Sequence, residues 1–280
     1  MKHGLRVVVL ALGALQAASG SGLAADVVLA PHRAVYDVTL KRTSERADLS
    51  GADGRLAMEL GGSDCEGWTT SFRMANEFRP REGNGRVIDT QSAGWESGDG
   101  LSMRYNQREF LDGSQQAERK VSARRDAAGG IGQAEFEKPE QRTLELSPDT
   151  VFSIEHQKRL LRAAMAGSSH DSTLVFDGSD DSAGYRAIAF IGARKAPGQA
   201  RSAIAGAAGE VLSKLSAWPM TISFYSTKPG EDGGEATPAY QIGLTMYENG
   251  VADNLVLDYG DFALGGNLKV LEFLKQEPCE

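Results

Sequence analysis

Three oxygen-bearing side chains at alternate positions form the chain's most recognisable pattern for binding a metal. Asp177, Ser179 and Asp181 follow an apolar run, and this spacing is typical of the start of a calcium-binding loop. A loop of the EF-hand type also needs glycine at its sixth position and glutamate at its twelfth. The sequence has Ser182 and Ile188 at these places. We therefore interpret the segment as a solvated hairpin turn and predict no metal site.

Two cysteines, Cys65 and Cys279, could form a disulfide, bind a metal or take part in redox chemistry. A metal site would need further ligands, and His32, His156 and His170 show no spacing that converges on the cysteines. The C-x-x-C motif that is typical of redox sites is absent. In an exported chain, as argued below, an even pair most simply predicts a structural disulfide. Free or intermolecular thiols are the alternative.

No catalytic constellation is recognisable in the sequence. The G-x-S-x-G elbow, the metalloprotease helix motif and the glycine loop that cradles phosphates are all absent. Asp180 and Asp181 are adjacent turn residues, with nothing to separate their pKa values. We interpret His156 as a partly buried helix residue rather than a general base. We therefore predict a protein that is not an enzyme and needs no cofactor. A secreted hydrolase of unknown substrate is the alternative.

Residues 147–167 are predicted to form the one well-defined helix. Thr150 or Ser153 can accept from the first free backbone N–H groups, and Gly167 supplies a C-terminal stop. One apolar stripe recurs at helical spacing, made of Ile154, Leu160, Leu161, Ala164 and Met165. Three basic side chains fall mostly off this stripe, namely Lys158, Arg159 and Arg162. A helix of about four turns is too short to be stable alone in water, so we expect the stripe to pack against strands.

The remainder of the chain alternates apolar and polar residues with the period of two that indicates half-buried strands. We expect strands near residues 36–41, 56–60, 68–78, 86–95, 101–111, 118–125, 132–136, 141–146, 172–177, 184–195, 218–227, 240–248, 251–259, 261–264 and 267–274. We expect turns at residues 51–54 and 265–266, and a short helix at 210–215. A dozen or more short strands predict a mainly β fold: a barrel, a sandwich or a strongly curled sheet.

The first 25 residues read as a cleavable signal peptide. A short basic lead is followed by the apolar run Val7–Leu15 and by small residues up to Ala25, with cleavage expected near Ala24 or Ala25. A membrane anchor or a disordered N-terminus is the alternative. No later segment is long and apolar enough to cross a membrane. We therefore expect a periplasmic protein that does not span the membrane, with residues 26–280 forming a single domain.

The net charge narrows the classes of partner. It is −8 for the whole chain, and removal of the leader takes away Lys2 and Arg6 but no acid, which leaves about −10. A surface of this sign argues against nucleic acid and against simple electrostatic binding to anionic lipid. An outer-membrane β-barrel is also disfavoured, because the predicted strands carry charges on both faces and lack lipid-facing apolar alternation.

Several short pieces of the sequence occur together in one order and spacing. They are the run at residues 30–37, Cys65 followed by Trp68, Val151-Phe152 with His156, the run Val175–Gly178, the run Tyr247–Val251, the run Tyr259–Phe262, and a cysteine as the second-last residue. In these pieces the chain, from Ala30 to Cys279, resembles the EipB family of periplasmic envelope-integrity proteins.

The resemblance implies a curled antiparallel β-spiral of about fourteen strands that forms a cup, with the amphipathic helix nested in it. It also implies a disulfide between Cys65 and Cys279, and a non-enzymatic role in cell-envelope integrity and stress resistance. The curled sheet is similar to the lipoprotein-carrier folds, which hold acyl chains or lipoproteins. Ser153 stands where the resemblance leads us to expect a proline.

A curled sheet that buries one helix stripe leaves clefts on either side of the helix, where apolar side chains can line a ligand pocket. The expected partner is a lipid, a lipoprotein or an envelope protein. The candidate ligand-binding residues are Phe152, His156, Leu160, Leu161 and Met165. The alternative is that these side chains are simply part of the core.

Overall fold

The structure, a computed structural model, describes residues 27–228, 237–276 and 279. The predicted signal peptide and its cleavage site therefore lie outside the described residues. The strands are β1 (His32–Thr43), β2 (Leu49–Ser63), β3 (Gly67–Pro80), β4 (Arg86–Glu96), β5 (Ser102–Leu111), β6 (Ser114–Arg125), β7 (Gly132–Lys138), β8 (Arg142–Leu146), β9 (Thr150–Val151), β10 (His170–Val175), β11 (Tyr185–Ile191), β12 (Ala217–Ser226), β13 (Tyr240–Tyr247), β14 (Ala252–Asp258) and β15 (Phe262–Phe273). The helices are η1 (Glu45–Ala47), α1 (Ser153–Met165) and α2 (Gly206–Ser213).

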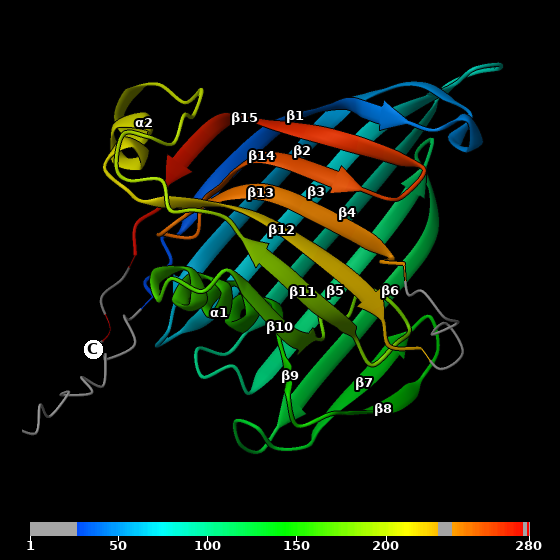
Figure 1. Ribbon diagram of the computed structural model, residues 1–280. Coiled ribbons are helices and arrows are strands. Elements are labelled where there is room, and N and C mark those ends of the chain that lie inside the picture. The colour runs from blue at the N-terminus through cyan, green and yellow to red at the C-terminus, as the bar shows by residue number, and fades with distance from the viewer. Residues whose placement is uncertain (1–26, 229–236, 277–278, 280) are drawn as a thin grey trace, which may run out of the picture.

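All these strands belong to one sheet, which curls into a nearly closed barrel with a single seam (Figure 1). Consecutive strands pair with each other within the series β1–β8 and within the series β9–β15, and β1 pairs with β15 to join the two halves. The pairs are antiparallel except β9 with β10. The strands at the seam are β8 and β9, which a short turn connects. The predicted mainly β, curled sheet with a helix is confirmed, with fifteen described strands instead of about fourteen.

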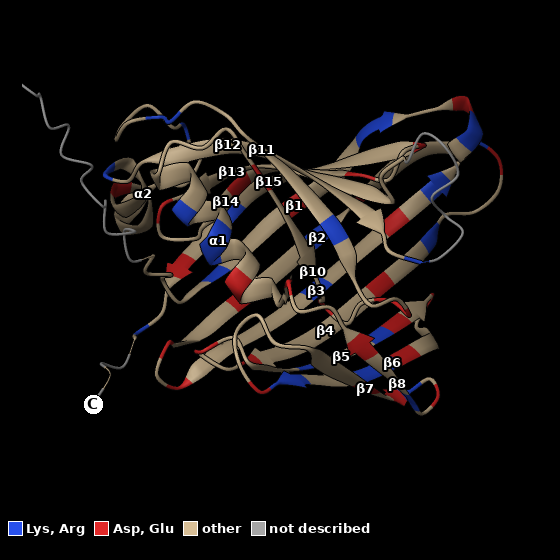
Figure 2. Cartoon of the chain, turned by 60° about the horizontal axis from the view of Figure 1, so that its bottom comes forward, with Lys and Arg blue, Asp and Glu red and all other residues tan. Residues whose placement is uncertain are grey.

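Strand alternation separates an inner from an outer face of the sheet. Tyr36 of β1 pairs with Leu56 of β2 and with Leu268 of β15, and all three side chains are buried. Charged residues recur along β2–β6 (Figure 2), and those at alternate positions of β3, such as Arg73 and Glu77, are exposed. One face therefore contributes to the core and the other meets water, as expected for a half-buried sheet.

Two predicted turns are wrong, because glycines at residues 51–54 and 265–266 lie inside long strands. One glycine of each pair faces a close neighbour: a Cβ at Gly54 would overlap the Ala75 carbonyl of β3, and one at Gly266 would lie 3.1 Å from the Cβ of Leu255. Glycine in a strand often marks such a close approach rather than a turn. The chain instead turns at η1, where Asp48 has φ 45°.

The helix α1 is shorter than predicted at its start. Its N-cap is Phe152, which makes no side-chain capping hydrogen bond, and Thr150 belongs to β9. Its end agrees with the prediction, since Gly167 has φ 80° and donates to the carbonyl of Ala164 at 3.0 Å. No helix within the described ranges is long and apolar enough to cross a membrane.

The helix α1 lies at one end of the curled sheet (Figure 1), and most of its apolar stripe is buried. Ile154, Leu160 and Leu161 pack in one cluster with Leu60 and Trp68 from the ends of β2 and β3. The same cluster includes inward side chains of β11 and β12. Since α1 could not hold its shape alone, this packing is what stabilises it.

Candidate functional site

The start of α1 is held by a carboxylate from a distant strand. Glu96, at the end of β4, accepts hydrogen bonds from the backbone N–H groups of Ile154 at 2.8 Å and Glu155 at 3.0 Å. These are amides that the helix itself leaves unpaired. Burial raises the pKa of Glu96 to about 7, although the two N–H donors act in the opposite direction. The predicted caps, Thr150 and Ser153, are thus replaced by a residue 58 positions away from Ile154.

A second charged contact holds the middle of α1. Lys158 is buried, contrary to its predicted place off the apolar stripe, and its ammonium group pairs with Asp64 and lies 5.4 Å from the centre of the Trp68 ring. The Trp68 indole N–H donates to the same carboxylate at 2.7 Å. The buried charge is therefore tolerated because a carboxylate and an aromatic face meet it.

The predicted disulfide is present beside this contact. Cys65 follows Asp64 directly and is bonded to Cys279, with their Cα atoms 5.7 Å apart. The bond connects the β2–β3 turn to the end of the chain. It therefore fixes the turn that carries the carboxylate partner of Lys158.

The turn after β10 is packed into the structure, and the interpretation of residues 177–182 as a solvated turn is wrong. Phe176 is fully buried and meets Phe136 edge-to-face at 6.3 Å. Gly178 has φ 76°, and a Cβ there would lie 2.5 Å from a methyl group of Val121. The Asp177 side chain between them is only partly exposed, and burial raises its pKa. Packing on both sides of this residue fixes its position.

An interior cavity of about 290 Å³ lies where this turn, the start of α1 and strands β3–β5 meet. Its walls include the aromatic side chains of Trp68, Phe72 and Tyr105 and the carboxyl groups of Glu96 and Asp177. The helix contributes Ser153 and Ile154 to the lining. The cavity is therefore apolar with a few polar groups, which is the usual composition of a small-ligand site.

Beyond this cavity, toward the end of the sheet away from α1, the inner wall stays apolar but is only half-buried. Its half-buried apolar side chains are Leu40, Met58, Phe72, Met74, Phe78, Tyr240, Ile242, Leu244, Leu255, Leu257 and Phe262. We call this set the inner wall. Because these groups face the interior of the curled sheet without being fully covered, they offer contact area to an apolar guest.

The five predicted ligand-binding residues do not line this cavity. Phe152, Leu160 and Leu161 are fully buried, His156 is buried 6.3 Å from the Phe224 ring, and Met165 is half-buried against the same core. Burial lowers the pKa of His156 to about 4, and its Nε2 atom has no hydrogen-bond partner. This packing is the alternative considered from the sequence, and a role in ligand contact stays a prediction.

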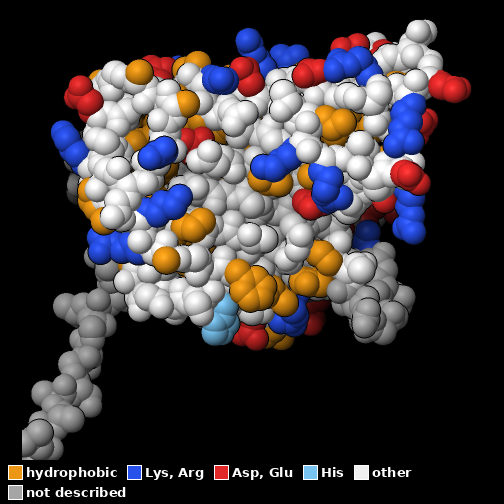
Figure 3. Space-filling model, turned by 45° about the horizontal axis from the view of Figure 1, so that its top comes forward, with side chains coloured by type: hydrophobic (Ala, Val, Ile, Leu, Met, Phe, Trp, Pro, Cys, Tyr) orange, Lys and Arg blue, Asp and Glu red, His pale blue; other side chains and the backbone are white. Residues whose placement is uncertain are grey.

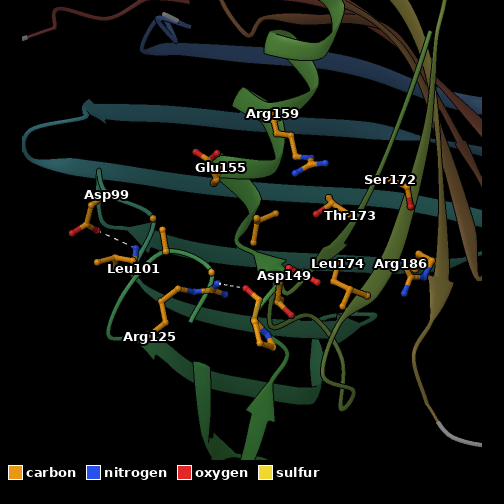
Figure 4. Close-up of a pocket in the computed structure, with 16 residues that line it drawn as sticks. Asp99, Leu101, Arg125, Asp149, Glu155, Arg159, Ser172, Thr173, Leu174 and Arg186 are labelled. Atoms are coloured by element: carbon orange, nitrogen blue, oxygen red, sulfur yellow. Dashed lines mark hydrogen bonds between the residues drawn. The ribbon is translucent and has the colours of Figure 1, made fainter. Parts of the chain in front are cut away.

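A second cleft, of about 560 Å³, lies where α1, β9, β10 and the turns after β4 and β6 meet (Figure 4). Three arginines and three acidic residues line it, namely Arg125, Arg159, Arg186, Asp99, Asp149 and Glu155. Arg125 is buried, with its guanidinium 5.2 Å from the Phe152 ring, and donates to the Pro148 carbonyl at 3.2 Å. This arginine holds the turn at the seam, and the balanced charges give the cleft no preference for ions of one sign.

The described residues show no arrangement for metal binding or nucleophilic catalysis. No three His, Cys, Asp or Glu side chains within residues 27–228, 237–276 and 279 lie close enough to hold a metal ion. In the same ranges, no serine hydroxyl is hydrogen-bonded to a histidine ring, as a nucleophile activated by histidine would require.

Sequence reasoning missed Glu96, Lys158 and Asp177 as site residues. Glu96 carries no local signal, because its partners lie on a helix distant in the sequence. Asp177 did stand in one of the pieces that indicated the family, directly before Gly178. A glycine whose φ and close neighbours exclude a side chain was the available hint that this turn is fixed.

The comparisons with known proteins agree with this geometry. The sequence profile of the EipB-like family matches residues 23–275. The chain is 34% identical over 258 residues to the cell envelope integrity protein EipB of Brucella abortus (strain 2308), covering 91% of this chain and 88% of that protein. It is also similar to the crystal structure of a beta-barrel-like protein of the domain of unknown function DUF1849 from Brucella abortus, with a TM-score of 0.79 and 32% identity over 89% of this chain and 100% of that one. The chain therefore belongs to the EipB-like family.

Proposed function

We propose that the protein supports the integrity of the cell envelope from the periplasm, without catalysis, by holding the apolar chain of a lipid or lipoprotein inside its curled sheet. The relative from Brucella abortus is named as a cell envelope integrity protein. The observation that carries the binding mode is the inner wall, whose apolar side chains face the interior and are only half-buried. In the view of Figure 3, by contrast, hydrophobic side chains on the outside are scattered among polar and charged ones.

The inner wall is suited to binding a long apolar chain, such as an acyl chain, rather than the flat surface of a partner. Its side chains come from β1–β3 on one side and from β13–β15 on the other, so a guest would meet apolar groups from both. Burial of apolar surface contributes roughly 25 cal/mol per Å², and a long acyl chain gains about 0.8 kcal/mol for each methylene that leaves water. Met74 and Phe72 are the members of this wall in the middle of β3.

The experiment compares two variants of the same strand. Met74→Asp places a charge on the inner wall, and Ser71→Asp places the same charge on the exposed outer face of β3. We expect native mass spectrometry of protein released gently from the periplasm to show a bound species of lipid mass in the wild type and in Ser71→Asp, and to show none in Met74→Asp. Circular dichroism establishes that both variants are folded.

A cellular assay completes this test. Cells that lack the gene should lose resistance to envelope-disrupting detergent, and the Ser71→Asp gene should restore that resistance while the Met74→Asp gene should not. If folded Met74→Asp restores resistance as well as the wild type does, the inner wall is not the site of function. A bare protein in every sample would point instead to a scaffold that acts through protein partners.

A further inference from the structure

The Asp177 carboxylate stands in the interior cavity without a cation beside it. It accepts a hydrogen bond from the backbone N–H of Ser179 at 2.8 Å, and no lysine or arginine of the described residues forms an ion pair with it. Its neighbours in the same turn differ. Asp181 pairs with Arg119 at 2.6 Å, and Asp180 pairs with Lys228 at 3.5 Å. One carboxylate of three thus faces the cavity uncompensated.

The fold holds this carboxylate in place at a cost. A charged group removed from water without a counter-charge loses several kcal/mol of solvation. Exposure of the Asp177 carboxylate to solvent would relieve that cost. The turn is held in place, however, because Phe176 packs in the core and Gly178 packs against Val121 and Tyr105. A titratable group kept in a cavity against its own solvation is a candidate for binding.

The walls around Asp177 suit a positively charged organic group. Trp68, Phe72 and Tyr105 present aromatic rings, whose faces attract ammonium groups. The Lys158 ammonium, which does not line the cavity, lies 5.4 Å from the centre of the Trp68 ring. Arg104 also borders the cavity, but its guanidinium lies 5.0 Å from the Trp95 ring, on the opposite face of the sheet, so it does not oppose a cation inside.

We propose that the cavity binds an ammonium or quaternary ammonium group at the end of an apolar molecule, with the Asp177 carboxylate as its counter-ion. The inference rests on the proposed function and names the head group of the guest. A volume of about 290 Å³ is at the low end for ligand sites and fits a head group rather than a whole amphiphile. The half-buried inner wall begins at Phe72, which lines both regions, so the chain can continue from the cavity along the wall.

The test uses three amphiphiles that share a dodecyl chain: dodecyltrimethylammonium, dodecyl maltoside and dodecyl sulfate, each below its critical micelle concentration. Binding to the full-length mature protein is measured by isothermal titration calorimetry and by tryptophan fluorescence, since Trp68 and Trp95 both line the cavity. We expect the cationic probe to bind at least tenfold more tightly than the other two. We expect Asp177→Asn to weaken the cationic probe at least tenfold and to leave the maltoside unchanged.

Controls separate charge from structure. Asp177→Glu keeps the charge and should retain the preference for the cation, while Asp89→Asn removes a carboxylate from the outer face of β4 and should bind like the wild type. The Asp177→Asn variant should fold, because its neutral side chain removes a carboxylate that has no counter-charge. If all three probes bind equally to the wild type and to Asp177→Asn, the cation site is refuted, but the proposed binding of an apolar chain by the inner wall is supported. If none binds, both proposals fail.

Discussion

Replacement of Glu96 by glutamine should change how the stability of the protein depends on pH. The carboxyl group is 5% exposed and caps α1 through two backbone N–H groups. Burial raises its pKa from an ordinary 4.5 to about 7. Each pKa unit corresponds to about 1.4 kcal/mol, so the shift amounts to about 3 kcal/mol in the free energy of unfolding.

The sign follows from which form the fold prefers. A raised pKa means that the folded state binds the proton more tightly than the unfolded state does. The contribution of Glu96 to stability is therefore fully present below about pH 4.5 and is lost as the pH rises through about 7. Glutamine does not titrate, so the free energy of unfolding of the Glu96→Gln variant lacks this dependence on pH. It keeps a neutral acceptor for one of the two helix N–H groups, and that difference does not depend on pH.

Urea unfolding followed by tryptophan fluorescence, at intervals from pH 4 to pH 8.5, measures the effect. We expect the free energy of unfolding of the wild type minus that of Glu96→Gln to fall by about 3 kcal/mol across this range. Glu135→Gln, on an exposed position of β7, serves as the control and should follow the wild type. A difference that is flat or rises with pH would refute the reasoning, because the helix N–H groups and dipole would then outweigh burial.

Three further predictions concern the supports of α1. Because burial lowers the pKa of His156 to about 4, this histidine makes the wild type lose stability as the pH falls from about 6.5 through about 4. His156→Leu should remove this loss. Acid unfolding curves of the two proteins check the prediction. Replacing Cys65, Cys279 or both by serine should lower the free energy of unfolding by up to about 5 kcal/mol, because one bond closes the 214-residue loop. The double variant should be no less stable than either single variant. Urea unfolding with and without reductant tests this, and losses that add up in the double variant would contradict a shared bond. Asp64→Asn should lower the free energy of unfolding by about 1–3 kcal/mol, and by more than Lys158→Met does, because it leaves a buried ammonium group without its partner. A double-mutant cycle measures the coupling between the two residues, and equal losses in the two single variants would refute this account.

Much of the fold could be predicted from local pattern. Alternation of apolar and polar residues located most strands, and helical spacing located α1, since both periods follow from backbone geometry alone. The errors arose where a residue type has two uses. Glycines at residues 51–54 and 265–266 read as turns, but they serve close strand contacts, and only the neighbouring strand distinguishes the two.

The candidate site was less predictable than the fold. The sequence by itself determined an apolar helix face, a pair of cysteines able to bond and a family membership, because each of these depends on residue type and order. Only the tertiary structure decided that Glu96 caps α1 and that Asp177 faces an interior cavity. Burial and charge pairing are properties of residues brought together from distant parts of the chain. The same aspartate is an ordinary turn residue in the sequence, while in the fold burial raises its pKa.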